Sequence, residues 1–421
     1  MNKFYKWLRK SFNKTRSSIA FYPALISIGF LLLSVLMLEL DFSEAGKHIK
    51  SQLSWISLRD ASTARTILGT VAGGIISLTV FSFSMVMILL SQVASQLSNR
   101  MLDSMIGNRF QQIILGFYIG TIVFALFLLS TIRDITSGIY VPALSIYLLL
   151  VLTVVDLFLF IYFLHYVTQS VKFGTIIERI HKNTFHTLYR ICITGKPKFF
   201  ELPELAPQII YTASSDYYQG CNANELLKFA GTHNGLIQFL HPPGTFLLKG
   251  TPLLHFYSSV KLSRKDVQEM METIDFYTGQ PIHVNAYYGY HQLAEVAIKA
   301  LSPGINDPET AVISLHALTD LFLYRLHHFI KTVFVDEEGL PRINTVEYSF
   351  ERLFAECYYP IWDYGKKDRY IQDALQQMLE QLRGCDIDGT QSSLFTAFLK
   401  KIKSQKAKDE FRAINREQNL G

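Results

Sequence analysis

The amino-acid sequence predicts a membrane bundle of four transmembrane helices joined to a cytosolic α+β domain. Three observations support this fold class: four long apolar segments within residues 1–168, short strand-like runs between residues 231 and 260, and helical spacing from residue 291 onward. We therefore expect an all-α transmembrane domain over residues 1–168, a linker helix over residues 169–205 that extends the fourth span, and a cytosolic domain over residues 206–421. The cytosolic domain should contain a small β-barrel or sheet and a helical C-terminal part.

Each apolar segment is long enough to cross a bilayer, because a helix needs about 20 mostly apolar residues to span about 30 Å of hydrocarbon. The four segments comprise residues 22–38, 66–99, 110–132 and 135–171. Only the fourth contains a charged residue, Asp156. The second segment has 34 residues, more than a bilayer requires, so we expect its C-terminal end to continue as a helix into water.

Basic residues flank the spans unevenly. Lysines and arginines cluster before the first span and again between residues 172 and 190, whereas the connection after the third span has only Arg133, next to Asp134. Because basic residues are retained on the cytoplasmic side, we predict that both termini are cytoplasmic. The first span is read as a retained anchor, since its apolar run is long and no clear cleavage site follows Leu40.

The second span carries a hydroxyl side chain at every seventh residue: Thr70, Ser77, Ser84, Ser91 and Ser98. Seven residues complete two helical turns less about 20°, so these side chains form a slowly drifting stripe, called here the hydroxyl stripe. It either packs against a neighbouring helix or lines a central pore in a ring of subunits, with a lipid-filled interface as a third reading. The glycine pairs Gly69/Gly73 and Gly116/Gly120 are typical of close helix contact.

Asp156 is predicted on the cytoplasmic side of the midplane of the fourth span. A charge inside the membrane costs roughly 2.5 to 3.5 kcal/mol on insertion scales, so we expect this side chain to face the bundle interior. Two interpretations remain open. Asp156 marks a polar pathway, or it is a protonated or hydrogen-bonded carboxyl that holds helices together, with a hydroxyl of the second span as its partner.

The cytosolic part is predicted from two changes of periodicity. Apolar runs at residues 235–240, 243–248 and 252–257, separated by Pro and Gly, predict short strands. After residue 291, apolar residues with helical spacing predict two helices separated by a turn at residues 301–307.

Residues 300–311, Ala-Leu-Ser-Pro-Gly-Ile-Asn-Asp-Pro-Glu-Thr-Ala, form that turn. Gly304 permits a tight turn, Asp307 can cap the following helix, and Pro308 fits its first turn. A ligand-binding interpretation also exists, since Ser302, Asn306 and Asp307 at a helix start could bind an anion through backbone amides or a cation through their oxygens.

The same segment, residues 300–311, resembles the signature of a bacterial family of predicted membrane proteins known as domain of unknown function 2254. Residues 82–84, Gln96 and Arg100 at the exit of the second span, and residues 163–165 in the fourth, are similar to this family as well. The resemblance covers nearly the whole chain. It implies four spans and a cytosolic domain in a bacterial inner membrane, and it implies no activity.

The chain departs from the family pattern just before residue 291. Relatives tend to show an Arg-Thr pair and an acidic residue where this sequence has Gln280, Pro281 and Asn285. A site that those charged groups form in relatives therefore cannot be carried over residue by residue.

The composition excludes several partners and chemistries. The net charge of +5 is spread over the basic flanks, which suits contact with anionic lipid and offers no compact patch for nucleic acid.

All four cysteines follow residue 191 without close C-x-x-C spacing, so we expect free thiols and no metal site. Common motifs of nucleotide-binding, hydrolase and metalloprotease sites are missing from the sequence, so we expect neither a cofactor nor an enzyme.

Together, these patterns favour a homo-oligomeric channel or transporter for an ion or small solute. In this hypothesis Ser77, Ser84 and Ser91 contribute the path, Asp156 tunes its charge, and the cytosolic domain senses a ligand and gates it. The alternative is a non-conducting membrane-anchored scaffold or sensor, and a membrane enzyme comes third. A cytosolic cleft with converging ionisable groups would favour the enzyme.

Overall fold

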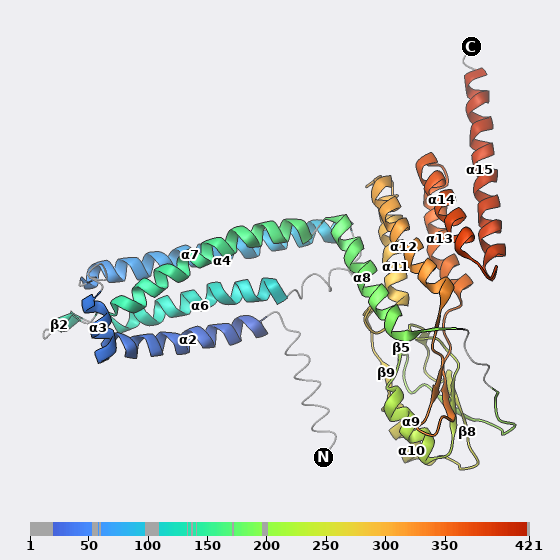
Figure 1. The fold of residues 1–421 in the computed structure, drawn as a ribbon, viewed down its shortest axis with the longest axis horizontal. Coiled ribbons are helices and arrows are strands. Elements are labelled where there is room, and N and C mark those ends of the chain that lie inside the picture. The colour runs from blue at the N-terminus through green and yellow to red at the C-terminus, as the bar shows by residue number, and fades with distance from the viewer. Residues whose placement is uncertain are drawn as a thin grey trace. The chain divides into compact units, whose positions relative to one another are not determined.

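The computed structural model describes residues 20–52, 58, 60–96, 109–132, 134–135, 138–139, 141–170, 172–195 and 201–418. The chain divides into two compact units, which we call the N-terminal unit (residues 1–172) and the C-terminal unit (residues 173–421). Figure 1 labels the elements of both units along the chain.

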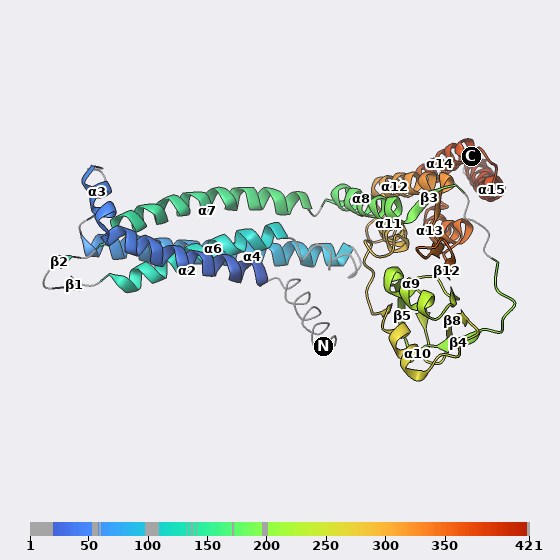
Figure 2. The same ribbon diagram turned by 60° about the horizontal axis from the view of Figure 1, so that its bottom comes forward.

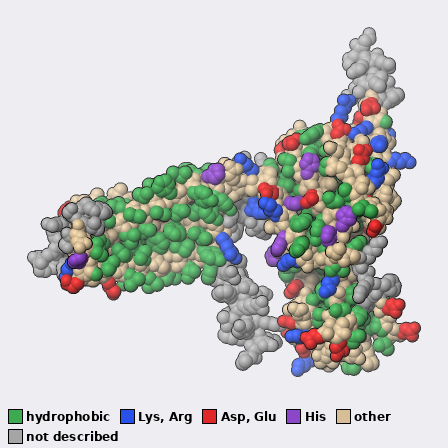
Figure 3. Space-filling view, in the orientation of Figure 1, with side chains coloured by type: hydrophobic (Ala, Val, Ile, Leu, Met, Phe, Trp, Pro, Cys, Tyr) green, Lys and Arg blue, Asp and Glu red, His purple; other side chains and the backbone are tan. Residues whose placement is uncertain are grey.

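Long apolar helices build the N-terminal unit (Figures 1 and 2). Its elements are α2 (Phe21–Phe42), α3 (Glu44–Gln52), α4 (Ala61–Gln96), α6 (Arg109–Thr131), β1 (Asp134–Ile135), β2 (Gly138–Ile139) and α7 (Ala143–Ser170). Four of these helices, α2, α4, α6 and α7, are long and apolar enough to cross a membrane, as predicted. Figure 3 shows hydrophobic side chains covering the visible face of this unit, as contact with lipid requires.

Two glycines allow α6 to pack closely against α2. A Cβ atom added to Gly116 would lie 2.7 Å from Cδ1 of Ile26, and one added to Gly120 would lie 2.7 Å from the ring of Phe30. Gly116 and Gly120 thus form a helix contact of the kind that small residues permit. On α4, by contrast, a Cβ atom added to Gly69 or Gly73 would meet no described atom within 4 Å.

An aspartate of α2 caps the N-terminus of α7. The buried Asp41 carboxylate accepts hydrogen bonds from the Leu144 N–H (3.0 Å), the Ser145 N–H (2.8 Å) and the Ser145 hydroxyl (2.5 Å). Lys50 of α3 forms an ion pair with the same carboxylate at 2.7 Å. The amide donors and the ammonium group compensate the buried charge, so they hold three helices together at this end of the bundle.

The strands of the C-terminal unit form open sheets. Of the two predicted alternatives, a small β-barrel or a sheet, the structure confirms the sheet. A mixed five-stranded sheet has the order β11-β12-β6-β8-β4, an antiparallel three-stranded sheet has the order β7-β5-β9, and β10 pairs with β3. The strands are β3 (Cys192–Thr194), β4 (Gln208–Tyr211), β5 (Asp216–Cys221), β6 (Leu236–Phe239), β7 (Phe246–Leu247), β8 (Pro252–Tyr257), β9 (Ile274–Phe276), β10 (His328–Ile330), β11 (Val333–Val335) and β12 (Pro341–Asn344).

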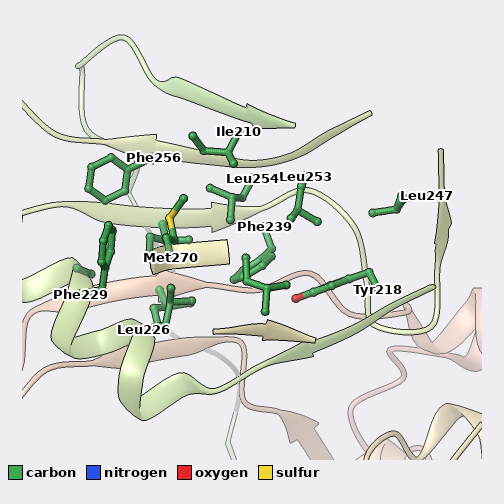
Figure 4. Close-up of a cluster of buried hydrophobic side chains, with 14 residues drawn as sticks. Ile210, Tyr218, Leu226, Phe229, Phe239, Leu247, Leu253, Leu254, Phe256 and Met270 are labelled. Carbon is green, nitrogen blue, oxygen red and sulfur yellow. The ribbon is translucent and has the colours of Figure 1, made fainter. Parts of the chain in front are cut away.

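The three runs predicted as strands correspond to β6, β7 and β8. Strands β6 and β8 pair with each other, with Ile237 opposite Phe256, whereas β7 pairs with β5 in the other sheet. Helices α9 (Ala223–Thr232) and α10 (Arg264–Met271) cover a core of large apolar side chains that Figure 4 shows, including Phe229, Phe239 and Met270.

Figures 1 and 2 show a second group of helices in this unit, and strand β3 lies among them in Figure 2. They are α8 (Phe173–Ile191), α11 (Tyr287–Ala300), α12 (Pro308–His327), α13 (Phe350–Gly365), α14 (Arg369–Cys385) and α15 (Ser392–Gln418). Buried aromatic rings join them: Phe354 lies against Phe322, Tyr358 and Phe398, with ring centroids 4.3 to 5.9 Å apart.

The region predicted as one linker helix, residues 169–205, has a different structure. Helix α7 ends at Ser170, a separate helix α8 begins at Phe173, and Cys192–Thr194 is a strand that pairs with β10. A hydrophobic pattern with helical spacing does not distinguish one helix from two consecutive helices, which explains the difference.

Candidate functional site

The first candidate site surrounds Asp156 in the N-terminal unit. Asp156 lies in the middle of α7 and is fully buried. Neither of its carboxylate oxygens has a hydrogen-bond partner among the described residues. A carboxyl in this situation lacks the compensation that a buried polar group ordinarily receives.

Four further buried polar groups share this property within the described part of the chain. They are the hydroxyls of Ser82, Tyr118 and Thr121 and the side-chain carbonyl of Gln112. Thr121 lies beside the Asp156 carboxylate and Ser82 beside the Tyr118 phenol, without reaching hydrogen-bond geometry. We call these five residues the Asp156 cluster.

A cavity of about 130 Å³ adjoins the cluster. Its walls come from α4, α6 and α7; they are mostly apolar and include Ser82, Gln112 and Tyr118. A buried polar group left without a partner costs roughly 1 to 3 kcal/mol, whereas a bound water or ion restores the missing interactions. The cavity has room for a few water molecules beside Ser82, Gln112 and Tyr118.

The hydroxyl stripe lies on a different side of α4. Thr70, Ser77, Ser84 and Ser91 are exposed, and Ser98 lies outside the described residues. The hydroxyls of Ser77 and Ser84 donate to backbone carbonyls of their own helix, at 3.0 and 2.9 Å. The fold therefore does not bring the stripe to Asp156.

Ser82 belongs to the site, although the predicted stripe includes Ser84, two residues further along the chain, and not Ser82. Two residues correspond to about 160° around a helix, so Ser82 faces the interior where Ser84 faces outward. Gln112 and Thr121 were missed as well. The signal available for them was a polar residue within an apolar span, a feature that by itself suggests a functional position.

The predicted signature turn connects α11 and α12 in the C-terminal unit. Asp307 caps α12 by accepting hydrogen bonds from the Thr310 N–H (3.1 Å) and hydroxyl (2.6 Å), and the Ser302 hydroxyl donates to the Lys299 carbonyl at 2.6 Å. Asn306 adopts the left-handed conformation, with φ of 49°, whereas Gly304 does not. The tight turn thus depends on Asn306, contrary to the role expected of Gly304.

These local bonds use the side chains of Ser302 and Asp307, two of the three residues that the ligand-binding interpretation requires. They support the interpretation of the signature as a helix-turn-helix connection. Among the described residues, no group of three or more His, Cys, Asp or Glu side chains is arranged to hold a metal ion.

A second cavity, of about 260 Å³, lies within the C-terminal unit, between the sheets and the helical group. We call it the Glu347 cavity. Its polar lining includes Tyr218 of β5, Asp275 of β9, Arg325 of α12, and Glu347 and Tyr348 between β12 and α13. A cleft with converging ionisable groups is a general mark of a binding or catalytic site.

Burial changes the ionisation of two groups in this cavity. It raises the pKa of Glu347 to about 7, and the Arg325 guanidinium opposes part of that rise. Burial, together with the charge of Asp275, raises the pKa of the Cys221 thiol to about 12. Cys221 is therefore a neutral thiol at physiological pH and is not an activated nucleophile.

A hydrogen-bonded network orients the aromatic wall of the cavity. Glu356 accepts hydrogen bonds from the Tyr287 hydroxyl (2.5 Å) and from Nε of Arg352 (2.9 Å), and His291 lies 3.1 Å away. Burial raises the pKa of Glu356, but these interactions outweigh it and hold the pKa below its ordinary value. The Tyr287 ring stacks on Tyr348, with centroids 4.1 Å apart, so both rings have a fixed orientation.

Four apolar helices and an α+β region with open sheets define a multi-pass α-helical membrane protein whose spans contact the lipid bilayer. The family described as "Predicted membrane protein (DUF2254)" matches residues 16–381, and the chain therefore belongs to this family.

The chain is also similar to two mycobacterial proteins that are described as uncharacterized. One, from Mycobacterium tuberculosis (strain CDC 1551 / Oshkosh), is 24% identical over 286 residues, which cover 61% of this chain and 51% of the relative. The other, from Mycobacterium bovis (strain ATCC BAA-935 / AF2122/97), is 25% identical over 280 residues, with the same coverage. The chain thus spans about half the length of these relatives. No solved structure matches it significantly.

Proposed function

We propose that the N-terminal unit carries protons or small cations across the membrane along a polar path within each subunit, centred on Asp156. The observation that carries this proposal is the Asp156 cluster, in which five buried polar side chains have atoms without partners among the described residues. Three of the five, Ser82, Gln112 and Tyr118, also line a cavity. An acidic side chain without a nearby base attracts a cation or a proton, so we favour these over anions.

The order of the cluster along the helices suggests where the path opens. With both termini in the cytoplasm, α4 and α7 run inward and α6 runs outward. Ser82 and Gln112 then lie on the cytoplasmic side of Asp156 and Thr121. Gln112 and Thr121 are nine residues apart, which is about 13 Å along a helix, so the polar groups extend from the middle of the bilayer toward the cytoplasm.

Apolar side chains close the other half of this path. Leu68 of α4, Leu128 of α6 and Leu149 of α7 are fully buried in one apolar cluster beyond Asp156. The Asp41–Lys50 pair connects helices at the same end. Passage would require this apolar cluster to open, as in a gated channel or a carrier with alternating access.

The proposal includes a homo-oligomer. The hydroxyl stripe, Gly69 and Gly73 lie on exposed parts of α4, where small residues would let a second copy approach closely. In this arrangement the stripe is a contact between subunits, and the path lies within each subunit.

A sensor that does not conduct is the second candidate, because the Glu347 cavity offers the C-terminal unit a place for a ligand. In that case the Asp156 cluster would only join helices. An enzyme remains third: the cavity has converging ionisable groups, but the neutral Cys221 thiol disfavours covalent catalysis.

Flux from proteoliposomes tests the proposal. The purified full-length protein is reconstituted, and H⁺, Na⁺, K⁺ and Cl⁻ fluxes are measured for the wild type, Asp156→Asn and Ser84→Ala. We expect cation or proton flux that Asp156→Asn reduces to the level of empty liposomes. Ser84→Ala is the matched control, since its hydroxyl is exposed and bonds to its own helix. Wild-type flux unchanged by Asp156→Asn, or no flux from folded protein, would favour the sensor.

A further inference from the structure

Two opposite charges enter the Glu347 cavity from different elements. Arg325 lies in the last turn of α12, and Glu347 lies between β12 and α13. The Arg325 guanidinium donates to the His328 carbonyl at 2.7 Å, which holds it in place. The two charges interact, yet within the described ranges they form no ion pair, and Glu347 accepts no hydrogen bond.

From this arrangement we infer that the Glu347 cavity binds a small zwitterion of the size of a free α-amino acid, with its ammonium group toward Glu347 and its carboxylate toward Arg325. This inference does not depend on the transport proposed for the N-terminal unit, because every residue that carries it belongs to the C-terminal unit.

Three side chains that line the cavity can accept hydrogen bonds from an ammonium group: Tyr218, Asp275 and Glu347. The buried Tyr218 hydroxyl, which has no hydrogen-bond partner in the described structure, lies within electrostatic range of Glu347 and Asp275. An ammonium group has three N–H donors, so these three side chains match its number of hydrogen bonds. The Tyr218 ring stacks on Phe239 with centroids 5.4 Å apart, which fixes the direction of its hydroxyl.

Donors for a carboxylate are supplied by two basic side chains that line the same cavity. Arg325 uses one terminal nitrogen on the His328 carbonyl, and its planar guanidinium has further N–H groups for an anion. Lys331 is exposed, and its ammonium group lies 5.1 Å from the centre of the Phe334 ring. A ligand carboxylate can therefore receive charge-assisted hydrogen bonds from Arg325 and Lys331.

Charge balance favours a zwitterion over a ligand of one sign. A purely cationic ligand would leave Arg325 without a counterion in a partly desolvated place, and a purely anionic ligand would leave Glu347 in the same position. The lining also includes apolar side chains, which can accommodate the apolar side chain of an amino acid: Leu188, Ile191, Val284, Ile330 and Leu353. A volume of about 260 Å³ suits a ligand of this size.

Binding to the full-length protein in detergent micelles tests the inference. The twenty standard amino acids are screened at 10 mM by the shift in unfolding temperature, and the affinity of each one that binds is measured by calorimetry. Its decarboxylated amine and its deaminated acid are then compared; for leucine these are 3-methylbutan-1-amine and 4-methylpentanoate. We expect at least one amino acid to bind, and its amine and acid to bind at least about tenfold more weakly, because each loses charge-assisted hydrogen bonds.

Variants assign the binding to the cavity. Glu347→Gln and Lys331→Gln should each weaken binding by about tenfold, and Glu337→Gln, an exposed acid nearby in the sequence, is the matched control. Lys331 is exposed, so its substitution tests the carboxylate contact without the risk of unfolding that Arg325 carries. The inference is overturned if none of the amino acids shifts the unfolding temperature, if the amine binds as well as its amino acid, or if Glu347→Gln binds like the wild type.

Discussion

Each unit holds an acid that has no hydrogen bond from any described residue, Asp156 fully buried and Glu347 partly buried, but the surroundings of the two acids differ. Asp156 lies beside the Thr121 hydroxyl in an apolar bundle, whereas Glu347 interacts with the guanidinium of Arg325, which lines the same cavity. An acid without a counterion in an apolar bundle suits a mobile cation or proton. An acid opposite a fixed cation suits a ligand that carries both charges. The comparison teaches that the surrounding charges, more than the buried carboxyl itself, indicate what a site can bind.

Asp41 extends this comparison, because it is a buried acid whose partners are all present. Replacing Asp41 with Ala removes three hydrogen bonds to the start of α7 and leaves Lys50 without its counterion. We expect a loss of about 4 kcal/mol in the free energy of unfolding, measured in mixed lipid and detergent micelles. The control is Lys47→Ala, which removes an exposed pair with Glu44 and should have no measurable effect. Similar stabilities for both variants would mean that the cap is unimportant.

The second largest expected effect is the contribution of Glu347 to the free energy of unfolding, and this contribution depends on pH. The pKa of Glu347 rises from an ordinary value of 4.5 to about 7 because the carboxyl is buried, so the folded protein binds the proton more tightly than the unfolded chain. The resulting stabilisation is complete below pH 4.5 and is lost as the pH rises to about 7, a difference of about 3 kcal/mol.

Glu347→Gln should abolish this pH-dependent part of the stability. The free energy of unfolding of both proteins, measured at pH 5 and at pH 8, tests this expectation. The charged and titratable groups around Glu347 are unchanged in the variant: Cys192 on β3, Tyr218 and Cys221 on β5, Asp275 on β9, Arg325 on α12, Lys331 after β10, and the neighbouring Tyr348. The variant should therefore be more stable than the wild type at pH 8. An identical pH dependence in both proteins would show that Glu347 is not held in a desolvated place.

The two glycine pairs sharpen the contrast between the inner and outer faces of the N-terminal unit. Gly120→Ala places a methyl group 2.7 Å from the Phe30 ring, so we expect it to cost about 2 kcal/mol of stability by overpacking. Gly73→Ala enters open space and should be neutral or slightly stabilising in the monomer. Crosslinking of Gly73→Leu in membranes then tests the proposed contact between copies: unchanged oligomer yield would contradict it.

The smallest expected effect separates the two interpretations of Asp156. If the carboxyl belongs to a polar path, Asp156→Asn removes a buried group that has no described partner, and the protein should become more stable by about 1 kcal/mol. If Asp156 holds helices together, the same substitution should lower stability by a similar amount. Unfolding in micelles distinguishes these outcomes independently of flux.

Several local features were predictable because they depend on neighbouring residues alone. The four spans follow from the length and apolarity of their segments, and the structure confirms them. The cap of α12 follows from Asp307, Pro308 and Thr310, which are adjacent in the sequence. The strands β6 and β8 follow from short apolar runs bounded by Pro and Gly.

The inward side of α4 could not be predicted in the same way. In a membrane bundle both the lipid-facing and the buried sides of a helix are apolar, so periodicity alone does not identify which side meets the neighbouring helices. The seven-residue spacing led to Ser77 and Ser84, which are exposed, whereas Ser82 is buried in the Asp156 cluster.

The sequence by itself determined that this protein is a four-span membrane protein with an α+β C-terminal region, because hydropathy and short-range patterns are local properties of the chain. Only the tertiary structure decided which polar side chains meet. Tyr218, Arg325 and Glu347 line one cavity although more than a hundred residues separate the first from the other two. Such convergence depends on how strands and helices pack, and no pattern within a short window of sequence records it.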